Sequence, residues 1–447
     1  MYKFILAIRY FYKRRTSWVA LAAVALCVFI VVVVMTVMSG LVSEFKEKNH
    51  SFTGDCVVGT ESLVGFPYYE EFISDLNAAD FIESASPVIK NYALVNAESS
   101  RGMGVEIMGI NPGQYSKVTG FGQSIYYHKD ATKAFGPMAE PNLPGFIAGI
   151  DLWLNRDETG DYYFEPTPPA TAMTVTCFPL TAKGALAKAG TDLVNSKTFY
   201  FSDCSQSGLA RVDGSTIYLP FADTQLLCGM AEPVKRASWI HIKFRPGVNL
   251  DDSCRKVRML WEQFRGRMKE KQNGDLLAQV SVQGWKEYRR AFVAGMEKEQ
   301  IMLTAMFGLV GLTTVFIVLV VFYMIVSHKT KDIGILKSVG ASTPSVISLF
   351  LGFAGLIGAM GSVVGIAGGL WFLRNINAIE NWLFEKFGFQ LWDRTIYSIG
   401  EIPHRLDLTM LLVVTGCAIL ACIAGALLPS VQAARTNPAE TLQVNQL

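Results

Sequence analysis

The sequence predicts an α-helical membrane protein with four transmembrane helices and a large α+β extracytoplasmic domain inserted between the first and second helices. Three observations lead to this prediction. Four long runs of apolar residues carry no charged side chain over most of their length. A pattern of short strands and helices typical of water-soluble proteins fills about residues 44–298. Lys and Arg cluster at the run ends that are expected to stay in the cytoplasm.

The overall composition agrees with this class. Of the 447 residues, 51% are hydrophobic, so a membrane part is joined to a sizeable water-exposed part. The net charge of +2 is nearly balanced, which argues against a nucleic-acid-binding protein. The eight cysteines include no CxxC pair, and five of them lie outside the apolar runs. We therefore expect isolated buried thiols rather than a disulfide framework or a zinc site.

The N-terminal region is expected to anchor the chain with its start in the cytoplasm. Residues 1–15 mix aromatic and cationic side chains and predict an amphipathic helix along the cytoplasmic membrane surface. Residues 16–43 then run without a charge and predict the first transmembrane helix. No cleavage site of small residues is evident, which favours a retained helix over a cleaved signal peptide.

Residues 44–298 predict the α+β domain. Its candidate strands are rich in β-branched and aromatic residues and are bounded by turn-forming residues. They are Cys56–Gly59, Val88–Val95, Val105–Ile110, Ala172–Phe178, Thr198–Phe201, Thr216–Leu219, Trp239–Phe244 and Gln279–Val282. Helical patches lie near Tyr68–Asn77 and Ser253–Lys271. Strands and helices alternate irregularly, which favours α+β over a doubly wound sheet.

A cationic segment at 328–345 separates the second apolar run, 299–327, from the third, 346–374. Its position predicts a short cytoplasmic loop between two membrane helices. Within it, Ile333, Leu336 and Val339 recur at three-residue spacing and Gly340 supplies a helix stop, so a short amphipathic helix is expected. The pattern fits an interfacial anchor and a docking element for a cytoplasmic partner equally well.

The third apolar run is dense in glycine. Gly361, Gly365 and Gly369 repeat at four-residue spacing and so share one helix face, where small residues let helices approach closely. We favour packing between helices of this chain, with a seam between subunits as the alternative. Residues 375–407 predict an outer loop, 408–429 the last transmembrane helix and 430–447 a cytoplasmic tail.

Motifs for catalysis are absent from the sequence. It contains no GxxxxGK[ST] phosphate loop, HExxH or GxSxG, and its five histidines are dispersed. Apart from Glu299 and Arg374 at their ends, the apolar runs hold no Asp, Glu, Lys or Arg, which argues against an ion- or proton-coupled transporter. We therefore expect a non-catalytic subunit that binds no cofactor or metal and receives its energy from a partner.

The segment KTKDIGILKSVGAS resembles the coupling-helix signature of the FtsX-like, MacB-type family of ABC transporter permeases. Similar resemblances are VMSGL near the first helix, VEIMGINP, PGFIAGIDLW and the C-terminal LPSVQAARTNPAETLQ. The family resemblance implies that a separate ATPase, which binds ATP with Mg²⁺, docks on this helix. The implied docking residues are Lys329, Thr330, Lys331, Asp332, Ile333, Gly334, Ile335, Leu336, Lys337, Gly340 and Ala341.

The resemblance also carries expectations for the extracytoplasmic domain. It implies a base that continues from the membrane helices and an inserted β-rich lobe at about 140–235. It further implies a continuous helix over Gln283–Gln300 that transmits motion into the membrane, marked by Trp285, Glu297 and Lys298. The alternative is a long helix with a polar rim and no special role.

Tyr397 and the pair Ile402-Pro403 match the lipoprotein-releasing (LolC/LolE) branch of the family. This resemblance implies a permease in the bacterial inner membrane, with cytoplasmic termini and a periplasmic domain. The implied partners are a LolD-like ABC ATPase, a second identical or different permease chain, a lipoprotein substrate, membrane lipids and a periplasmic carrier. The implied activity is extraction of lipoproteins from the outer leaflet of the inner membrane.

Two questions stay open at this stage. The alternative function is a mechanotransmitting permease of MacB or FtsX type, which drives periplasmic export or activates a cell-wall hydrolase. Where the carrier-recruiting relatives carry a proline-bearing loop, this chain has PLTAKGALAKAGTDLVNSK with a single proline. Whether this chain itself recruits a carrier is therefore undecided.

Overall fold

The computed structural model describes residues 15–97, 102–154, 162–166, 168, 171–187, 194–328, 340, 342–388 and 408–435. The chain forms two compact units, one around residues 44–294 and one that holds most of the length of four long helices. Four expectations lie wholly or mostly outside the described residues: the amphipathic helix at 1–15 except Arg15, the coupling segment except Gly340, the motif Tyr397–Pro403, and the tail beyond Arg435.

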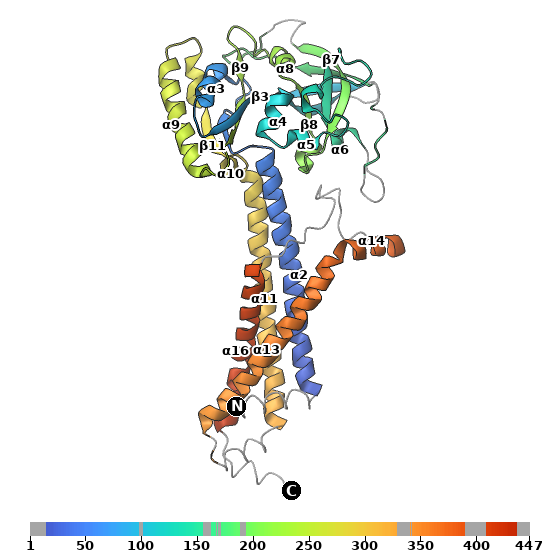
Figure 1. Ribbon diagram of the computed structural model, residues 1–447, viewed down its shortest axis with the longest axis vertical. Coiled ribbons are helices and arrows are strands. Elements are labelled where there is room, and N and C mark those ends of the chain that lie inside the picture. The colour runs from blue at the N-terminus through green and yellow to red at the C-terminus, as the bar shows by residue number, and fades with distance from the viewer. Residues whose placement is uncertain are drawn as a thin grey trace. The chain divides into compact units, whose positions relative to one another are not determined.

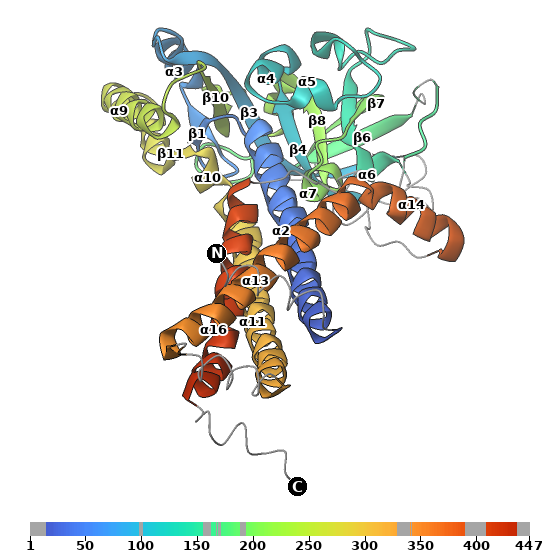
Figure 2. The same cartoon turned by 60° about the horizontal axis from the view of Figure 1, so that its bottom comes forward.

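Four described helices are long and apolar enough to cross a membrane. They are α2 (Arg15–Ser51), α11 (Arg290–His328), α13 (Thr343–Arg374) and α16 (Leu408–Arg435), drawn in Figures 1 and 2. Many of their large apolar side chains point outward, as expected for helices surrounded by lipid. Both α2 and α11 continue past the apolar runs that the sequence marks, α2 at its end and α11 at its start.

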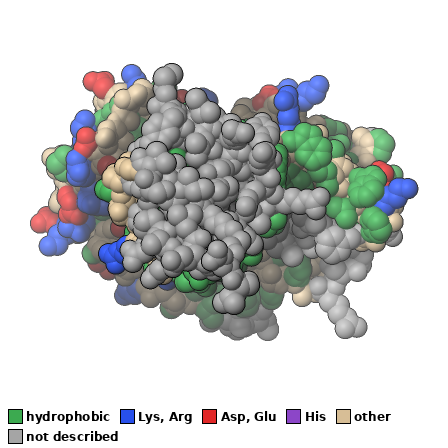
Figure 3. Space-filling model, turned by 90° about the horizontal axis from the view of Figure 1, so that it is seen from below, with side chains coloured by type: hydrophobic (Ala, Val, Ile, Leu, Met, Phe, Trp, Pro, Cys, Tyr) green, Lys and Arg blue, Asp and Glu red, His purple; other side chains and the backbone are tan. Residues whose placement is uncertain are grey.

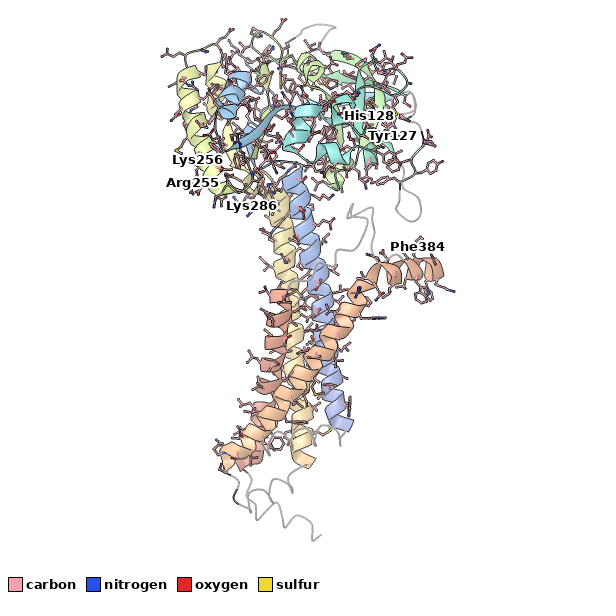
Figure 4. The ribbon with its side chains drawn as sticks, viewed as in Figure 1. Tyr127, His128, Arg255, Lys256, Lys286 and Phe384 are labelled. Atoms are coloured by element: carbon pink, nitrogen blue, oxygen red, sulfur yellow. The ribbon has the colours of Figure 1, made fainter. Side chains whose placement is uncertain are left out.

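A short helix, α14 (Ile376–Phe387), follows α13 directly where the sequence predicts an outer loop. Phe384, labelled in Figure 4, lies on this helix. Trp382 and Phe387 expose most of their side-chain surface and lie edge to face, with 5.9 Å between ring centroids. Exposed aromatic rings next to an apolar helix are typical of a membrane–water interface.

The other unit is built on a nine-stranded sheet with the order β11-β1-β10-β3-β4-β8-β5-β7-β6. Its strands are β1 (Cys56–Gly59), β3 (Ile82–Ala97), β4 (Met103–Ile110), β5 (Gly145–Gly149), β6 (Ala172–Cys177), β7 (Asn195–Ser205), β8 (Thr216–Pro220), β10 (Trp239–Phe244) and β11 (Ser281–Gly284). Two short strands, β2 (Phe66–Pro67) and β9 (Arg236–Ala237), pair separately.

Helical elements connect and cover these strands. They are α3 (Tyr69–Asn77), α4 (Pro112–Val118), α5 (Phe121–Ser124), η1 (Ala131–Lys133), α6 (Ile150–Trp153), α7 (Ala210–Asp213), α8 (Phe221–Leu227), α9 (Leu250–Met268), η2 (Gly274–Gln279) and α10 (Trp285–Tyr288). Strands and helices alternate irregularly, so this unit is a large α+β region. Each candidate strand from the sequence overlaps one observed strand, and both helical patches correspond to helices, α3 and α9.

Part of the sheet closes into a barrel. The end of β3 pairs with β6 through Leu94↔Thr176, while its other edge pairs with β4 through Leu94↔Gly104. Six strands therefore form the ring β3-β4-β8-β5-β7-β6. Closure removes the exposed edges of these strands, and Phe146, Phe199 and Phe201 fill the interior. The barrel requires β3 and β4, so residues 140–235 do not build this lobe by themselves.

A second core lies where helices cover the other end of the sheet. Helices α3 and α9 pack Phe72, Trp261 and Phe264 against Ile240 and other residues of the strands. Asn249 caps the start of α9 by accepting hydrogen bonds from the backbone N–H groups of Asp251 and Asp252. The outward face of α9 is charged, with side chains of both signs on that side of the molecule (Figure 3).

Arg236 joins the two cores. Its side chain is fully buried, and burial lowers the pKa of its guanidinium group. It donates to the carbonyl groups of Val64 at 2.8 Å, Leu180 at 3.0 Å and Gly229 at 2.5 Å. These carbonyls belong to three segments that are far apart in the sequence. Charge-assisted hydrogen bonds from its two terminal NH2 groups offset the cost of burying this charge, although its Nε has no hydrogen-bond partner among the described residues.

Replacing Arg236 by Met is expected to leave three buried carbonyl groups without their donor. We expect Arg236→Met to lower the free energy of unfolding by about 3 kcal/mol. Thermal unfolding of the full-length chain in mild detergent, followed by tryptophan fluorescence, measures this loss. The matched control is Arg265→Met, because Arg265 pairs with Glu262 on an exposed helix face. Equal shifts for the two variants would contradict the role of Arg236.

Candidate functional site

Two of the long helices lead into adjacent strands of the sheet. Helix α2 ends at Ser51, and β1 begins five residues later at Cys56. Strand β11 leads through α10 into α11, which begins at Arg290. Strands β1 and β11 pair antiparallel, with Cys56 opposite Gly284. We call residues 50–55 and 284–292 the helix–sheet junction, because the chain connects α2 and α11 to the sheet through them.

Asp55 holds the α2 side of the junction together. Its buried carboxylate accepts a hydrogen bond from His50 Nε2 at 2.7 Å and one from the Phe244 backbone N–H at 2.7 Å. The Lys243 ammonium group lies 3.9 Å away. Burial by itself would raise the pKa of Asp55, but the hydrogen bonds from His50 and Phe244 and the charge of Lys243 lower it. Asp55 is therefore an ionised anchor between the end of α2 and β10.

Trp285 connects this anchor to the α11 side. Its indole stacks on the His50 imidazole with ring centroids 4.6 Å apart, and its backbone N–H donates to the carbonyl of Asp55 at 3.2 Å. The expected continuous helix over 283–300 is wrong at its start. Gln283 and Gly284 belong to β11 because they pair with β1, and Arg289 separates α10 from α11. Lys286, labelled in Figure 4, lies on α10.

Arg289, at that break, ties the root of α11 to the root of α2. Its Nε donates to Thr53 Oγ1 at 3.0 Å, and its guanidinium group lies 5.3 Å from the centre of the Tyr288 ring. The carbonyl of Thr53 accepts a hydrogen bond at 2.8 Å from Nδ1 of His241, a residue of β10. The first turn of α11 is held further by Arg211 of α7, whose guanidinium group lies 5.4 Å from the centre of the Phe292 ring.

These contacts make the junction a fixed connection rather than a loose linker. Sequence reasoning singled out Trp285 but counted His50 and His241 only among five dispersed histidines. The residues that sequence reasoning missed lie at 50–55, 241–244 and 285–289, which meet only in the folded junction. Gly54 is the one sequence signal of a special turn among them, and in the structure its φ is +80°. Glu297 and Lys298 lie further along α11, and their predicted role in transmission stays a prediction.

The glycine face of α13 packs on α2. A Cβ atom added to Gly361 would lie 2.8 Å from Val24, and one on Gly369 would lie 3.2 Å from Val32. A Cβ atom on Gly365 would lie 2.6 Å from the Ala25 carbonyl oxygen. On this face glycine is the residue that lets the two helix backbones approach this closely.

Most of the predicted coupling segment lies beyond the described residues, namely Lys329–Lys337 and Ala341. Gly340 is described and has a φ of +97°, a left-handed conformation that favours glycine and ends helices. Ser342 then occupies the N-cap position of α13, which begins at Thr343, without a capping hydrogen bond from its side chain. The role of Lys329–Ala341 therefore stays a prediction.

Among the described residues, no three His, Cys, Asp or Glu side chains are grouped so that they could hold a metal ion. All eight cysteines are free thiols, as expected, but four of them are not isolated from one another. Hydrogen bonding with the Cys254 thiol raises the pKa of Cys56, and hydrogen bonding with the Cys177 thiol raises the pKa of Cys228. Sequence spacing could not show these pairs because their members are 198 and 51 positions apart.

Comparisons with known proteins point to one family. Residues 304–438 match the family model described as FtsX-like permease C-terminal. The chain is 23% identical over 442 residues to the lipoprotein-releasing system transmembrane protein LolC of Xylella fastidiosa (strain 9a5c), covering 96% of each chain. It is 23% identical over 443 residues to LolC of Neisseria meningitidis serogroup B, covering 96% of this chain and 94% of that relative.

One solved structure with a detectable likeness is the periplasmic region of MacB from Actinobacillus actinomycetemcomitans. The alignment covers 54% of this chain and 94% of that one, with 11% sequence identity and a TM-score of 0.30.

The buried His241 predicts a loss of stability in acid. Burial lowers its pKa from 6.5 to about 4, so the unfolded chain binds a proton at a pH where the folded chain does not. The stabilisation is complete above pH 6.5 and falls by about 3 kcal/mol as the pH drops to about 4. His241→Asn keeps an N–H donor for Thr53 but does not titrate. We expect the variant to lose less thermal stability than the wild type between pH 7 and pH 5, and an equal loss would contradict the assignment.

The close approach of α13 to α2 predicts that a large side chain at Gly365 separates them. Gly365→Leu is expected to destabilise the membrane helices by about 2 kcal/mol because its side chain overlaps the backbone of α2. Gly352→Leu is the matched control, since a Cβ atom there meets nothing within 4 Å. Thermal stability in mild detergent, measured by fluorescence-detected gel filtration, should fall for the first variant alone. A similar fall for both would contradict this packing.

Proposed function

Since the chain belongs to the FtsX-like permease family and resembles LolC over nearly its whole length, we propose that it releases lipoproteins from the membrane. It is the permease subunit of an ABC transporter, and permeases of this family are typically non-catalytic. In the proposed reaction a lipoprotein leaves the outer leaflet of the inner membrane, and a separate ATPase supplies the energy. The chain itself binds no cofactor in this proposal, and ATP with Mg²⁺ binds to the partner.

The helix–sheet junction is the observation that carries this proposal. Extracting a lipid-anchored protein requires that work done by the ATPase reach the outer side of the membrane. Helices α2 and α11 provide two parallel routes, and both end in the hydrogen-bonded junction around Asp55, Trp285 and Arg289. A fixed connection transmits displacement, whereas a loose linker would absorb it.

The energy is proposed to enter at the other end of α11. The segment that follows it, Lys329–Ala341, carries the coupling-helix resemblance and leads into α13. The sequence holds no phosphate loop of the GxxxxGK[ST] kind, which is consistent with an ATPase on another chain. We propose an assembly with two permease chains, identical or different, and a LolD-like ATPase.

The second candidate is mechanotransmission of MacB or FtsX type, without extraction of a lipid-anchored substrate. The same junction and coupling segment would serve it equally well. One observation supports this second candidate function. At the position of the carrier-recruiting loop, Thr181 and Ala185 close a tight turn with a backbone hydrogen bond of 2.8 Å, and Leu180 pairs with Leu186. Residues 181–185 therefore offer little projecting surface for a carrier, and residues 188–193 of the same segment lie outside the described residues.

Mass spectrometry of the complex purified from native membranes separates the two candidates. Triacylated lipoproteins that co-purify with this chain and an ATPase would support lipoprotein release. An ATPase with a membrane-fusion protein or a cell-wall hydrolase, and without lipoprotein, would favour the second candidate. Purification without any ATPase would contradict both.

The coupling segment predicts a specific loss of ATPase binding. Replacing Ile333 or Leu336 by Asp places a charge on the apolar face that is proposed to dock, which should weaken co-purification of the ATPase at least about tenfold. A control is Ser345→Asp, because Ser345 lies in the first turn of α13, outside the proposed docking residues. Undiminished co-purification and ATPase stimulation in the Ile333→Asp variant would contradict the docking role.

A further inference from the structure

Four cysteines of the α+β unit lie in two contacting pairs. Cys56 is on β1 and Cys254 on α9, while Cys177 ends β6 and Cys228 follows α8. All four are present as free thiols in the structure. Strand pairing and hydrogen bonds of neighbouring residues, described next, also place the two cysteines of each pair near each other.

The first pair bridges the sheet and α9. Gly284 lies directly opposite Cys56 in the pairing of β1 with β11. The Cys254 sulfur lies 3.6 Å from the position that a Cβ atom on Gly284 would take. It also lies 3.9 Å from the carbonyl oxygen of Asp55, the residue before Cys56. Arg258, one turn further along α9, donates to the Val282 carbonyl at 3.0 Å and keeps the helix on the same strands.

The second pair lies at one end of the barrel. Cys177 pairs with Asn195 across β6 and β7. The Asn195 side-chain amide donates at 3.1 Å to the carbonyls of Leu226 and Leu227, which directly precede Cys228. The Leu180 backbone N–H donates to the Cys228 carbonyl at 3.2 Å. Both cysteine side chains belong to the buried barrel core.

We propose that Cys56–Cys254 and Cys177–Cys228 form two disulfide bonds in the mature protein. The inference rests on the proposed function, which places this unit in the periplasm, where disulfides form and persist. Cys204, the remaining cysteine of the unit, lies opposite Ala148 in the pairing of β5 with β7 and belongs to neither pair. In this proposal the five cysteines of the unit form two disulfides and leave Cys204 as one buried thiol.

The oxidant is proposed to be a protein disulfide of the dithiol-oxidase class. A thiolate of the pair attacks one sulfur of that disulfide, which breaks its S–S bond and gives a mixed disulfide. The second cysteine, as thiolate, attacks the sulfur of the first and expels the oxidant's remaining thiolate. Two protons and two electrons leave the cysteine pair, and the oxidant ends as two thiols.

The exposures of the cysteines suggest the order of attack. In the first pair Cys254 is partly exposed whereas Cys56 is fully buried, so Cys254 is the residue that meets the oxidant. The hydrogen bond from the Cys56 thiol lowers the pKa of Cys254, which favours the attacking thiolate. Cys177 and Cys228 are both almost fully buried, so their bond must form before the barrel closes during folding.

The first bridge would reinforce the helix–sheet junction. It links β1, which follows the root of α2, to α9, which packs across the strands that lead to α11. Covalent attachment of α9 restrains β1 beside Asp55. The second bridge would restrain the end of β6 where the barrel closes.

Counting thiols in the chain purified from native membranes tests the proposal. The membranes are acid-quenched and denatured, and free thiols are alkylated with a mass-shifting maleimide before any reductant is added. We expect label on the cysteines outside the two pairs, Cys27, Cys204, Cys417 and Cys422, and label on all eight cysteines after reduction. Proteolysis without reduction should yield two linked peptides, one holding Cys56 and Cys254 and the other Cys177 and Cys228.

Two single-cysteine variants test the assignment of the pairs. Cys254→Ser should free Cys56 for labelling and remove one linked peptide, whereas the control Cys204→Ser should leave both linked peptides in place. Protease accessibility of the unit in spheroplasts is measured in parallel. Eight labelled cysteines in a protease-accessible unit would overturn the disulfides and leave the proposed function intact. Eight labelled cysteines in an inaccessible unit would overturn the periplasmic location and the disulfides together, and absence of one linked peptide would overturn that pair.

Discussion

The buried carboxylate of Asp55 is the interaction on which the arrangement at the root of α2 depends. It is held by a side chain from the end of α2 and by the backbone of β10, and its own carbonyl receives the N–H of Trp285. An ionised group in this position is stable only while its partners stay in place. The end of α2, the centre of the sheet and the start of α10 therefore keep a common geometry, and a displacement of one moves the others.

The long strand β3 extends this rigidity through the unit. Its first half pairs with β10 in the core that α3 and α9 cover, and its second half closes the barrel by pairing with β4 and β6. Arg236 adds hydrogen bonds to three segments between the two cores. A unit connected in this way is suited to move as one body when α2 and α11 shift, as the proposed release of lipoproteins requires.

Local patterns in the sequence were sufficient for much of the fold. Uncharged runs identify the long apolar helices, because lipid excludes charge over the length of a span. β-branched segments between turn residues identify strands such as Cys56–Gly59, whose bounds match β1. The ends of strands were harder, because β3 extends to 16 residues only through pairing with distant partners.

What the sequence could not predict depends on contacts between distant segments. The barrel closes through β3 and β6, whose paired residues lie about 80 positions apart, and no local signal encodes that pairing. The junction joins His50, His241 and Arg289, each of which looks ordinary beside its sequence neighbours. The helix expected from Gln283 starts late because pairing with β1 outweighs helix propensity there. The family resemblance singled out Trp285, but it did not reveal that His50 is its partner.

The central claim is that the junction couples ATP hydrolysis to release of the substrate. The most direct measurement uses the chain and its ATPase in proteoliposomes with a triacylated lipoprotein, recording ATP hydrolysis and lipoprotein release in the same sample. Trp285→Ala removes the stacking on His50, and Trp285→Phe preserves an aromatic ring as the control. The account predicts that Trp285→Ala hydrolyses ATP but releases little lipoprotein, while Trp285→Phe does both. Normal release by a folded Trp285→Ala variant would contradict it.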